Sequence, residues 1–297
     1  MKKQATLILW LTAFGIFVIL QTMIYHRNNR VARTGRAVDD QVSGAEAYRQ
    51  KKKDSCRIVV AIGSSLTGNG LYDGIDFARN SLEKFGKDIY MVSLTAPFDP
   101  GEMFLRDLKL VDRILPLKPD LFMIQMELAT IQFDPQKTSS FPDYTPFLIE
   151  LSSANLYFFD VFRLQERLAE KLNLPEKDIP LTGADTLKYA AATVHREIRK
   201  EASYLSEALV RLGEAGIPVL IYEVPRPYGN EIYSAPLKRQ LDSVLNALKA
   251  RYKTDYLFYD GPKMYYRFFA DGGHLNLSGS TRYTDWLNDR LINRLYP

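Results

Sequence analysis

The sequence predicts an α/β protein built on a doubly wound, parallel sheet. Short apolar, β-branched runs alternate along the chain with longer amphipathic stretches, and turn residues such as Gly63 and Lys118-Pro119 separate the two kinds of segment. Such alternation implies parallel strands with helices on both faces of the sheet. The 297 residues, of which 46% are hydrophobic, suffice for one large globular domain.

The apolar runs predict the strands, and the amphipathic stretches between them predict the helices. Five strands are expected, over residues 57–62, 88–94, 120–126, 218–224 and 255–260. Helices are expected over residues 72–85, 102–115, 184–215, 235–252 and 278–296. Between about 133 and 187 the alternation stops in an aromatic-rich and then charged stretch, which we interpret as an insertion that covers one side of the sheet.

The amino-terminal segment has the length and composition of a membrane span. Residues 5–25 (ATLILWLTAFGIFVILQTMIY) carry no charge, and about 20 apolar residues at 1.5 Å each cross a hydrocarbon core of roughly 30 Å. A cleaved signal peptide is the alternative. The apolar run is longer than a usual signal-peptide core, however, and bulky, basic HRNNR comes after it instead of small residues. We therefore predict an uncleaved transmembrane anchor over residues 1–26.

Two charge patterns give opposite orientations for this anchor. Four arginines come after the span within residues 27–36, which on the positive-inside count favours a cytoplasmic domain. The short basic amino terminus, with Lys2 and Lys3, instead resembles a bacterial signal anchor that exports the rest of the chain. Our working expectation is a single-pass protein of the inner or plasma membrane with an extracytoplasmic domain, and the sequence leaves the orientation open.

The excess of basic residues is confined to the region next to the span. Ten of the 39 Lys and Arg residues and three of the 35 Asp and Glu residues lie at or before Lys53, which leaves 29 basic and 32 acidic residues after it. The domain, residues 55–297, is thus mildly acidic, and nucleic acid is not an expected partner. Residues 27–54 have almost no apolar periodicity, so they are expected to form a solvated basic tether.

Two segments at the carboxyl ends of predicted strands carry residues suited to catalysis, because ligands gather at that edge of such a sheet. One is GSSLTGNG (63–70) after the first strand, and the other is DGGHLNL (271–277) between the last strand and the last helix. A serine hydroxyl becomes a nucleophile when a base lies within hydrogen-bonding reach and a third group orients that base. Ser65, His274 and Asp271 supply these three parts.

These segments resemble two blocks of the SGNH, or GDSL-type, hydrolase superfamily. GSSLTGNG is similar to the G-D-S-L-S/T-x-G block, with Ser64 where the family usually has Asp, and DGGHLN is similar to the final D-x-x-H block. The resemblance runs from about Arg57 to the end of the chain. It implies a flavodoxin-like three-layer α/β/α fold, with Ser65 as nucleophile, His274 as general base and Asp271 as orienting acid.

The two middle blocks depart from the family pattern. Where the family offers a glycine N–H and an asparagine side chain to the oxyanion, this chain has Ser93–Phe98 and the run from Ile124 to Ala129, which contain neither residue. One lost oxyanion donor costs about 10² to 10³ in rate. Substitute oxyanion or substrate contacts are predicted at Asn69, Gln125 and Glu127, and Arg226 is predicted to bind an anionic substrate group.

The pattern also resembles membrane-anchored SGNH-like proteins that modify cell-envelope polymers. This resemblance implies a serine O-acyl esterase or acyltransferase acting on an acylated glycan or small ester, with a membrane acyl-donor protein as a partner in the case of transfer. The alternative is a catalytically inactive SGNH-like module that binds a glycan or a partner protein. No cofactor is expected, because a phosphate loop and G-x-G-x-x-G are absent, and three histidines with one cysteine make a zinc site improbable.

Overall fold

The computed structural model describes residues 2–53, 55–95, 101–133, 196–198, 203–228, 235–270 and 273–297. The side chains of many residues before residue 31, and those of residues 131–133 and 196–198, are outside this description. The chain divides into two compact units, Met1–Asp40 and Gln41–Pro297. Helix α1 (Lys2–Lys51) begins in the first unit and ends in the second. Among the described residues, no helix meets the length and apolar character that a membrane crossing requires.

The second unit contains a five-stranded sheet in the order β2-β1-β3-β6-β7, with every neighbouring pair parallel. The strands are β1 (Arg57–Gly63), β2 (Ile89–Thr95), β3 (Leu121–Gln125), β6 (Val219–Tyr222) and β7 (Asp255–Leu257). Numbered along the chain, this is the 2-1-3-4-5 order of flavodoxin-like folds, in which ligands bind where the order reverses, between the first and third strands. The parallel α/β prediction is confirmed.

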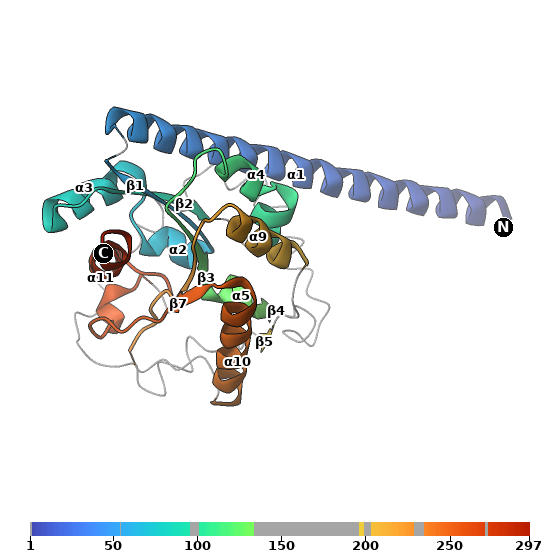
Figure 1. Cartoon of the computed structure of the whole chain (residues 1–297). Helices are drawn as coiled ribbons and strands as arrows, with labels where there is room; N and C mark the ends of the chain where they lie inside the picture. Colours follow the sequence, from blue (N-terminus) through green and yellow to red (C-terminus); the bar gives the residue numbers. More distant parts are fainter. Residues whose placement is uncertain are drawn as a thin grey trace. The chain divides into compact units, whose positions relative to one another are not determined.

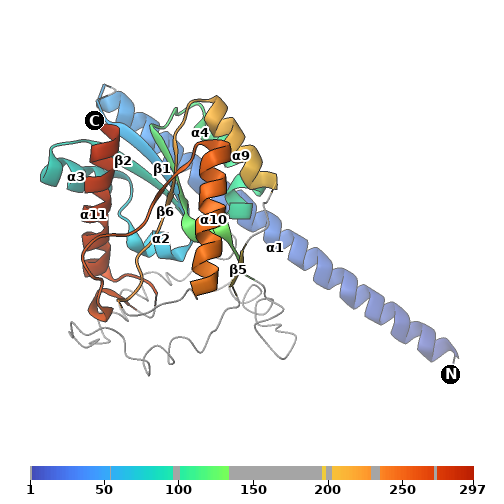
Figure 2. The same ribbon diagram turned by 60° about the horizontal axis from the view of Figure 1, so that its bottom comes forward.

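Both faces of the sheet are buried, which accounts for the continuous apolar runs in the strands. On one face, Val59, Met123 and Tyr222 form a core with Phe77 of α3 (Gly74–Phe85) and Trp286 of α11 (Leu277–Leu295). The opposite side is covered by α4 (Leu110–Ile114), α9 (Ser203–Glu214) and α10 (Ala235–Tyr252), whose contacts link α9 to β6 and to the other two helices. Figures 1 and 2 show α3 and α11 on the other side of the sheet from α9 and α10.

Several predicted elements differ in detail. The helix expected over 102–115 is a π-helix, η1 (Glu102–Asp107), followed by α4, because Lys109 between them has a left-handed backbone with φ 47°. Within the helix expected over 184–215, residues 196–198 form strand β5 (Arg196–Ile198), which pairs antiparallel with β4 (Ile131–Phe133), and α9 begins only at Ser203. Most of the predicted insertion, residues 134–187, is outside the described residues.

The last part of α1 differs from the solvated tether that the sequence predicts. Helix α1 continues to Lys51, and its end contacts the domain at two carboxylates. Arg49 donates to Asp120 (3.0 Å), while Asp88 accepts from the Tyr48 hydroxyl (2.9 Å) and pairs with Lys52 (2.8 Å). These partners lie about forty to seventy residues away in sequence, so periodicity within the segment gave no signal of them. Residues from 41 onward therefore belong to the domain.

Candidate active site

Ser65 lies at the carboxyl end of β1, on a turn that leads into the short helix α2 (Ser65–Gly70). Ser64 is the N-cap of this helix, and its hydroxyl accepts a hydrogen bond from the Leu66 N–H at 3.3 Å. Because Ser65 is the first residue of the helix, its N–H has no intrahelical acceptor. This N–H is therefore a candidate donor to an oxyanion that forms beside the Ser65 side chain.

The structure brings Ser65 and His274 together across 209 residues of sequence. The Ser65 Oγ lies 2.8 Å from the His274 Nε2, which is hydrogen-bonding distance. The loop that carries His274 is fixed by a bridge between Phe269 and Leu275 and by the Ala270 N–H, which donates to the His274 carbonyl at 2.8 Å. The pair thus lies at the carboxyl edge of the sheet on two anchored segments, at the distance over which a base could take the proton of a serine hydroxyl.

Gln125, the last residue of β3, lies beneath the Ser65 turn. Its Oε1 accepts from the Ser64 N–H (2.8 Å), the Ser64 hydroxyl (3.0 Å) and the Thr67 hydroxyl (2.9 Å). Its Nε2 donates to Glu127 at 2.9 Å. The Gln125 side chain, only 1% exposed, is therefore engaged with the protein itself. The prediction that it contacts substrate or oxyanion gains no support from this arrangement.

Glu127 and Arg226 form a buried ion pair at the same edge. The Arg226 Nη2 lies 2.9 Å from the Glu127 Oε1, and the two side chains are 18% and 6% exposed. Burial by itself would raise the pKa of Glu127, but the charge of Arg226 and the hydrogen bonds from Gln125 and the backbone outweigh burial and lower that pKa. Arg226, predicted to bind an anionic substrate group, thus has a carboxylate partner within the chain.

The remaining predicted residues have different outcomes. The Asn69 Nδ2 donates to the Ser65 carbonyl at 2.9 Å, one turn back along α2, so this side chain stabilises the turn locally. Asp271 and residues 96–100, which include part of the second family block, are outside the described residues. The assignment of Asp271 as the group that orients His274 remains a prediction.

Sequence reasoning missed two buried hydroxyls below the turn. Thr67 and Tyr222 are both 0% exposed, and their hydroxyl oxygens are 2.8 Å apart. The Tyr222 hydroxyl also donates to the Ile62 carbonyl at 3.3 Å, and burial raises its pKa far above the usual value. Polar atoms at strand ends are the signal that could have indicated them, since buried hydroxyls require hydrogen-bond partners.

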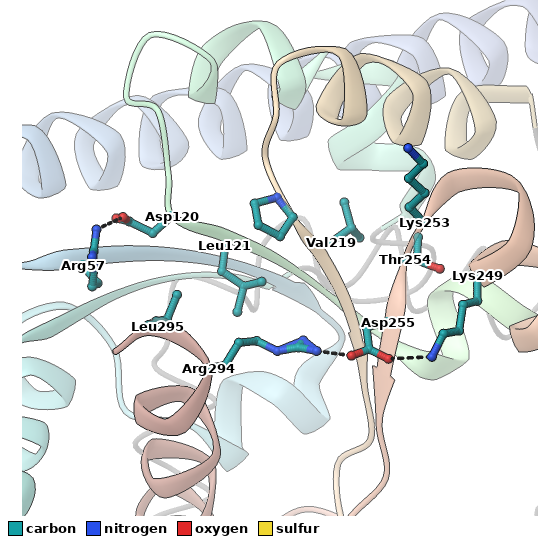
Figure 3. Close-up of a pocket in the computed structure, with 11 residues that line it drawn as sticks. Arg57, Asp120, Leu121, Val219, Lys249, Lys253, Thr254, Asp255, Arg294 and Leu295 are labelled. Atoms are coloured by element: carbon teal, nitrogen blue, oxygen red, sulfur yellow. Dashed lines mark hydrogen bonds and ion pairs between the residues drawn. The ribbon is translucent and has the colours of Figure 1, made fainter. Parts of the chain in front are cut away.

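A separate hollow of about 760 Å³ lies at the opposite, amino-terminal edge of the sheet (Figure 3). Its ion pairs join Arg57 with Asp120, and Asp255 with both Lys249 and Arg294. In this topology the helices end at that edge, and basic residues near helix carboxyl termini offset the negative end of the helix dipole. Lys249 and Arg294 lie in the last turns of α10 and α11, so helix capping accounts for them without a ligand.

Comparisons with known proteins leave the family of this chain open. A scan against protein-family models finds no match, and a search of curated proteins finds none either. Among solved structures, a crystal structure of TesA shares 16% identity (TM-score 0.40, covering 80% of this chain and 99% of that chain). A lipase/acylhydrolase from Enterococcus faecalis shares 15% (TM-score 0.40, 81% and 98%), and the acetyl xylan esterase AlAXEase 12% (TM-score 0.37, 80% and 98%). At this level of similarity they carry no weight for function.

Proposed function

We propose that this protein is an SGNH-type serine O-acyl esterase or acyltransferase. The observation that carries the proposal is the 2.8 Å contact between the Ser65 Oγ and the His274 Nε2 at the carboxyl edge of a parallel sheet. In the proposed reaction, the Ser65 oxygen attacks the carbonyl carbon of an ester while His274 takes the hydroxyl proton. The tetrahedral intermediate then collapses, the alkoxide leaves with the proton from His274, and the acyl group stays on Ser65.

The second half of the reaction returns the enzyme to its starting state. Water, or the hydroxyl of an acceptor, gives its proton to His274 and attacks the acyl-serine carbonyl, and Ser65 recovers its proton as it leaves. Hydrolysis and transfer differ only in the acceptor. We assign the orientation of His274 to Asp271 and one oxyanion contact to the Ser65 N–H.

A serine-directed fluorophosphonate tests the nucleophile. We expect the full-length protein to become covalently labelled and Ser65→Ala to lose the label, because only a serine oxygen activated by a base reacts at a useful rate. Ser278→Ala is a matched control that should still be labelled, since it removes an exposed serine hydroxyl of α11 and leaves the Ser65–His274 contact in place. Equal labelling of wild type and Ser65→Ala would overturn the assignment.

We propose further that residues 1–26 anchor the protein in the inner or plasma membrane, with the domain on the extracytoplasmic side. The uncharged run of residues 5–25 supports this proposal. The full chain should stay with membranes through alkaline carbonate extraction, because a spanning helix is held by hydrophobic burial, whereas a chain that begins at residue 27 should be released. Release of both forms, or a full chain shortened at its amino terminus, would contradict an uncleaved anchor.

An acylated cell-envelope polysaccharide is the substrate class that we propose, on the sequence resemblance to SGNH-like proteins that modify envelope polymers. A catalytically inactive glycan- or partner-binding module is the second candidate. It is favoured by one observation, namely that the amides of Gln125 and Asn69 both donate to protein oxygens. Binding of an acetylated polysaccharide without release of acetate, together with no turnover of aryl acetates, would favour the inactive module.

A further inference from the structure

A single oxygen atom of Gln125 accepts hydrogen bonds from residues on both sides of Ser65. Ser64 precedes the nucleophile and gives both its N–H and its hydroxyl, and Thr67, two residues after the nucleophile, gives its hydroxyl, all within 2.8–3.0 Å of the Gln125 Oε1. The last residue of β3 therefore accepts the hydrogen bonds of this turn, although the two lie about sixty residues apart in sequence. A lost contact here would leave the Ser64 N–H without an acceptor, which is costly away from water.

The orientation of the Gln125 amide is determined by its neighbours. A backbone N–H can only donate, so the atom 2.8 Å from the Ser64 nitrogen must be the carbonyl oxygen of the amide. The NH₂ group then faces the Glu127 Oε2 at 2.9 Å, where the carboxylate can only accept. If the amide were flipped, its NH₂ group would face the Ser64 N–H and its oxygen would face the Glu127 carboxylate. Neither pair could then form a hydrogen bond. Glu127 in turn keeps its charge because Arg226 pairs with it at 2.9 Å.

We propose that Gln125 is a positioning residue for the nucleophile, and that the Glu127–Arg226 pair holds its amide in the working orientation. The proposal rests on the proposed function, because it presupposes that Ser65 is the reacting group. Gln125 does not touch the substrate in this proposal. It sets the position of the Ser65 turn relative to His274, and a displacement of about 1 Å at such a point can cost about 10²-fold in rate.

Two substitutions at Gln125 separate positioning from general stability. Gln125→Met has similar length but offers no oxygen, and we expect fluorophosphonate labelling of Ser65 to slow by about 10²-fold. Gln125→Glu keeps an oxygen for the three donors but places a carboxylate against Glu127. Two facing carboxylates retain a shared proton, because the pKa of one of the two carboxyl groups is raised. While that proton is present, the pair can reproduce both the acceptor and the donor of the original amide.

A purely structural role of Gln125 would not change how the labelling rate depends on pH. This pH dependence therefore distinguishes positioning from stability. The ratio of the Gln125→Glu rate to the wild-type rate should be highest at mildly acidic pH and fall as pH rises, because the shared proton is lost. Among the described residues, the charged or titratable groups near Gln125 include Glu127 from α5 (Met126–Thr130), Arg226 after β6 and Tyr222 on β6, and His274 contacts Ser65. The raised pKa of Tyr222 keeps its hydroxyl neutral in this range. His274 is present in both proteins, so its effect on the labelling rate cancels in the ratio, and the change of the ratio with pH reports the carboxylate pair.

The matched control is Met123→Ala, a fully buried residue two positions earlier on β3. It should lower stability through a core cavity yet leave the labelling rate of the folded protein unchanged. Near-ultraviolet circular dichroism establishes that each variant is folded, and if Gln125→Met is not, the pH series of Gln125→Glu carries the test. A folded Gln125→Met that labels at the wild-type rate, or a Gln125→Glu ratio that is flat with pH, would overturn the proposal. Absence of Ser65 labelling in the wild type would instead overturn the proposed function.

Discussion

Replacing His274 with alanine is expected to reduce turnover of an activated aryl ester by about 10⁴-fold, while the protein stays folded. The reason is the contact of 2.8 Å between the His274 Nε2 and the Ser65 Oγ. Without the imidazole, the attacking hydroxyl has no group to take its proton, and the leaving alkoxide has none to supply one. The loss should fall mainly on kcat, because the imidazole acts in the transition state and contributes little to binding of the ester.

The nearby substitution Leu277→Ala is the control for this prediction. Leu277 is 76% exposed, begins α11 three residues after His274, and contributes no group to the proposed reaction. Turnover of the aryl ester by Leu277→Ala should match that of the wild type. Added imidazole should restore part of the activity of His274→Ala, since a small base can enter the space left by the side chain. If His274→Ala kept wild-type turnover, His274 could not be the general base.

Replacing Gly63 with alanine is expected to destabilise the domain by about 3 kcal/mol and to abolish labelling of Ser65. A Cβ at this position would lie 1.9 Å from the Thr67 Oγ1 and 2.3 Å from the Thr67 Cβ. Rotation of the Thr67 side chain cannot relieve the second contact. Thr67 is also fully buried and bonded to Gln125 and Tyr222, so the whole Ser65 turn must move away from β1.

Gly213 provides a matched glycine that should tolerate the same change. It lies near the end of α9, and a Cβ there would meet no atom within 4 Å. Gly213→Ala should therefore leave the free energy of unfolding at the wild-type value or raise it by about 0.5–1 kcal/mol, as expected for a helical site. Urea unfolding measures both variants. Equal stability of Gly63→Ala and wild type would show that the turn is not packed as closely as described.

The sequence predicted the sheet well because its central strands are buried on both faces. Residues Ile58 to Ile62 are all 0% exposed, so the strand could be recognised from an uninterrupted apolar run. The positions of Ser65 and His274 were inferred by the same reasoning, since both come after predicted strands. Their contact at 2.8 Å is the outcome that parallel topology makes possible, because strand ends far apart in sequence meet at one edge.

The parts that sequence reasoning missed depend on partners distant in the chain. The last turns of α1 are polar and show no periodicity, and they are fixed by Arg49 against Asp120. Gln125 and Arg226 lie at the carboxyl edge of the sheet, as predicted, but the structure shows each of them in contact with the protein itself. Residue type and position along a strand do not determine which way an amide or guanidinium points. That direction is set by the neighbouring donors and acceptors.

In the proposed reaction, Ser65 carries the acyl group between donor and acceptor. The most direct measurement is mass spectrometry of peptides from the full-length protein, quenched in acid during turnover of an aryl acetate. We predict an acetyl group on the peptide that contains Ser65, accumulating within the first turnover and disappearing when the ester is exhausted. Turnover that proceeds with no acyl group on that peptide, or with the acyl group on another residue, would contradict the claim.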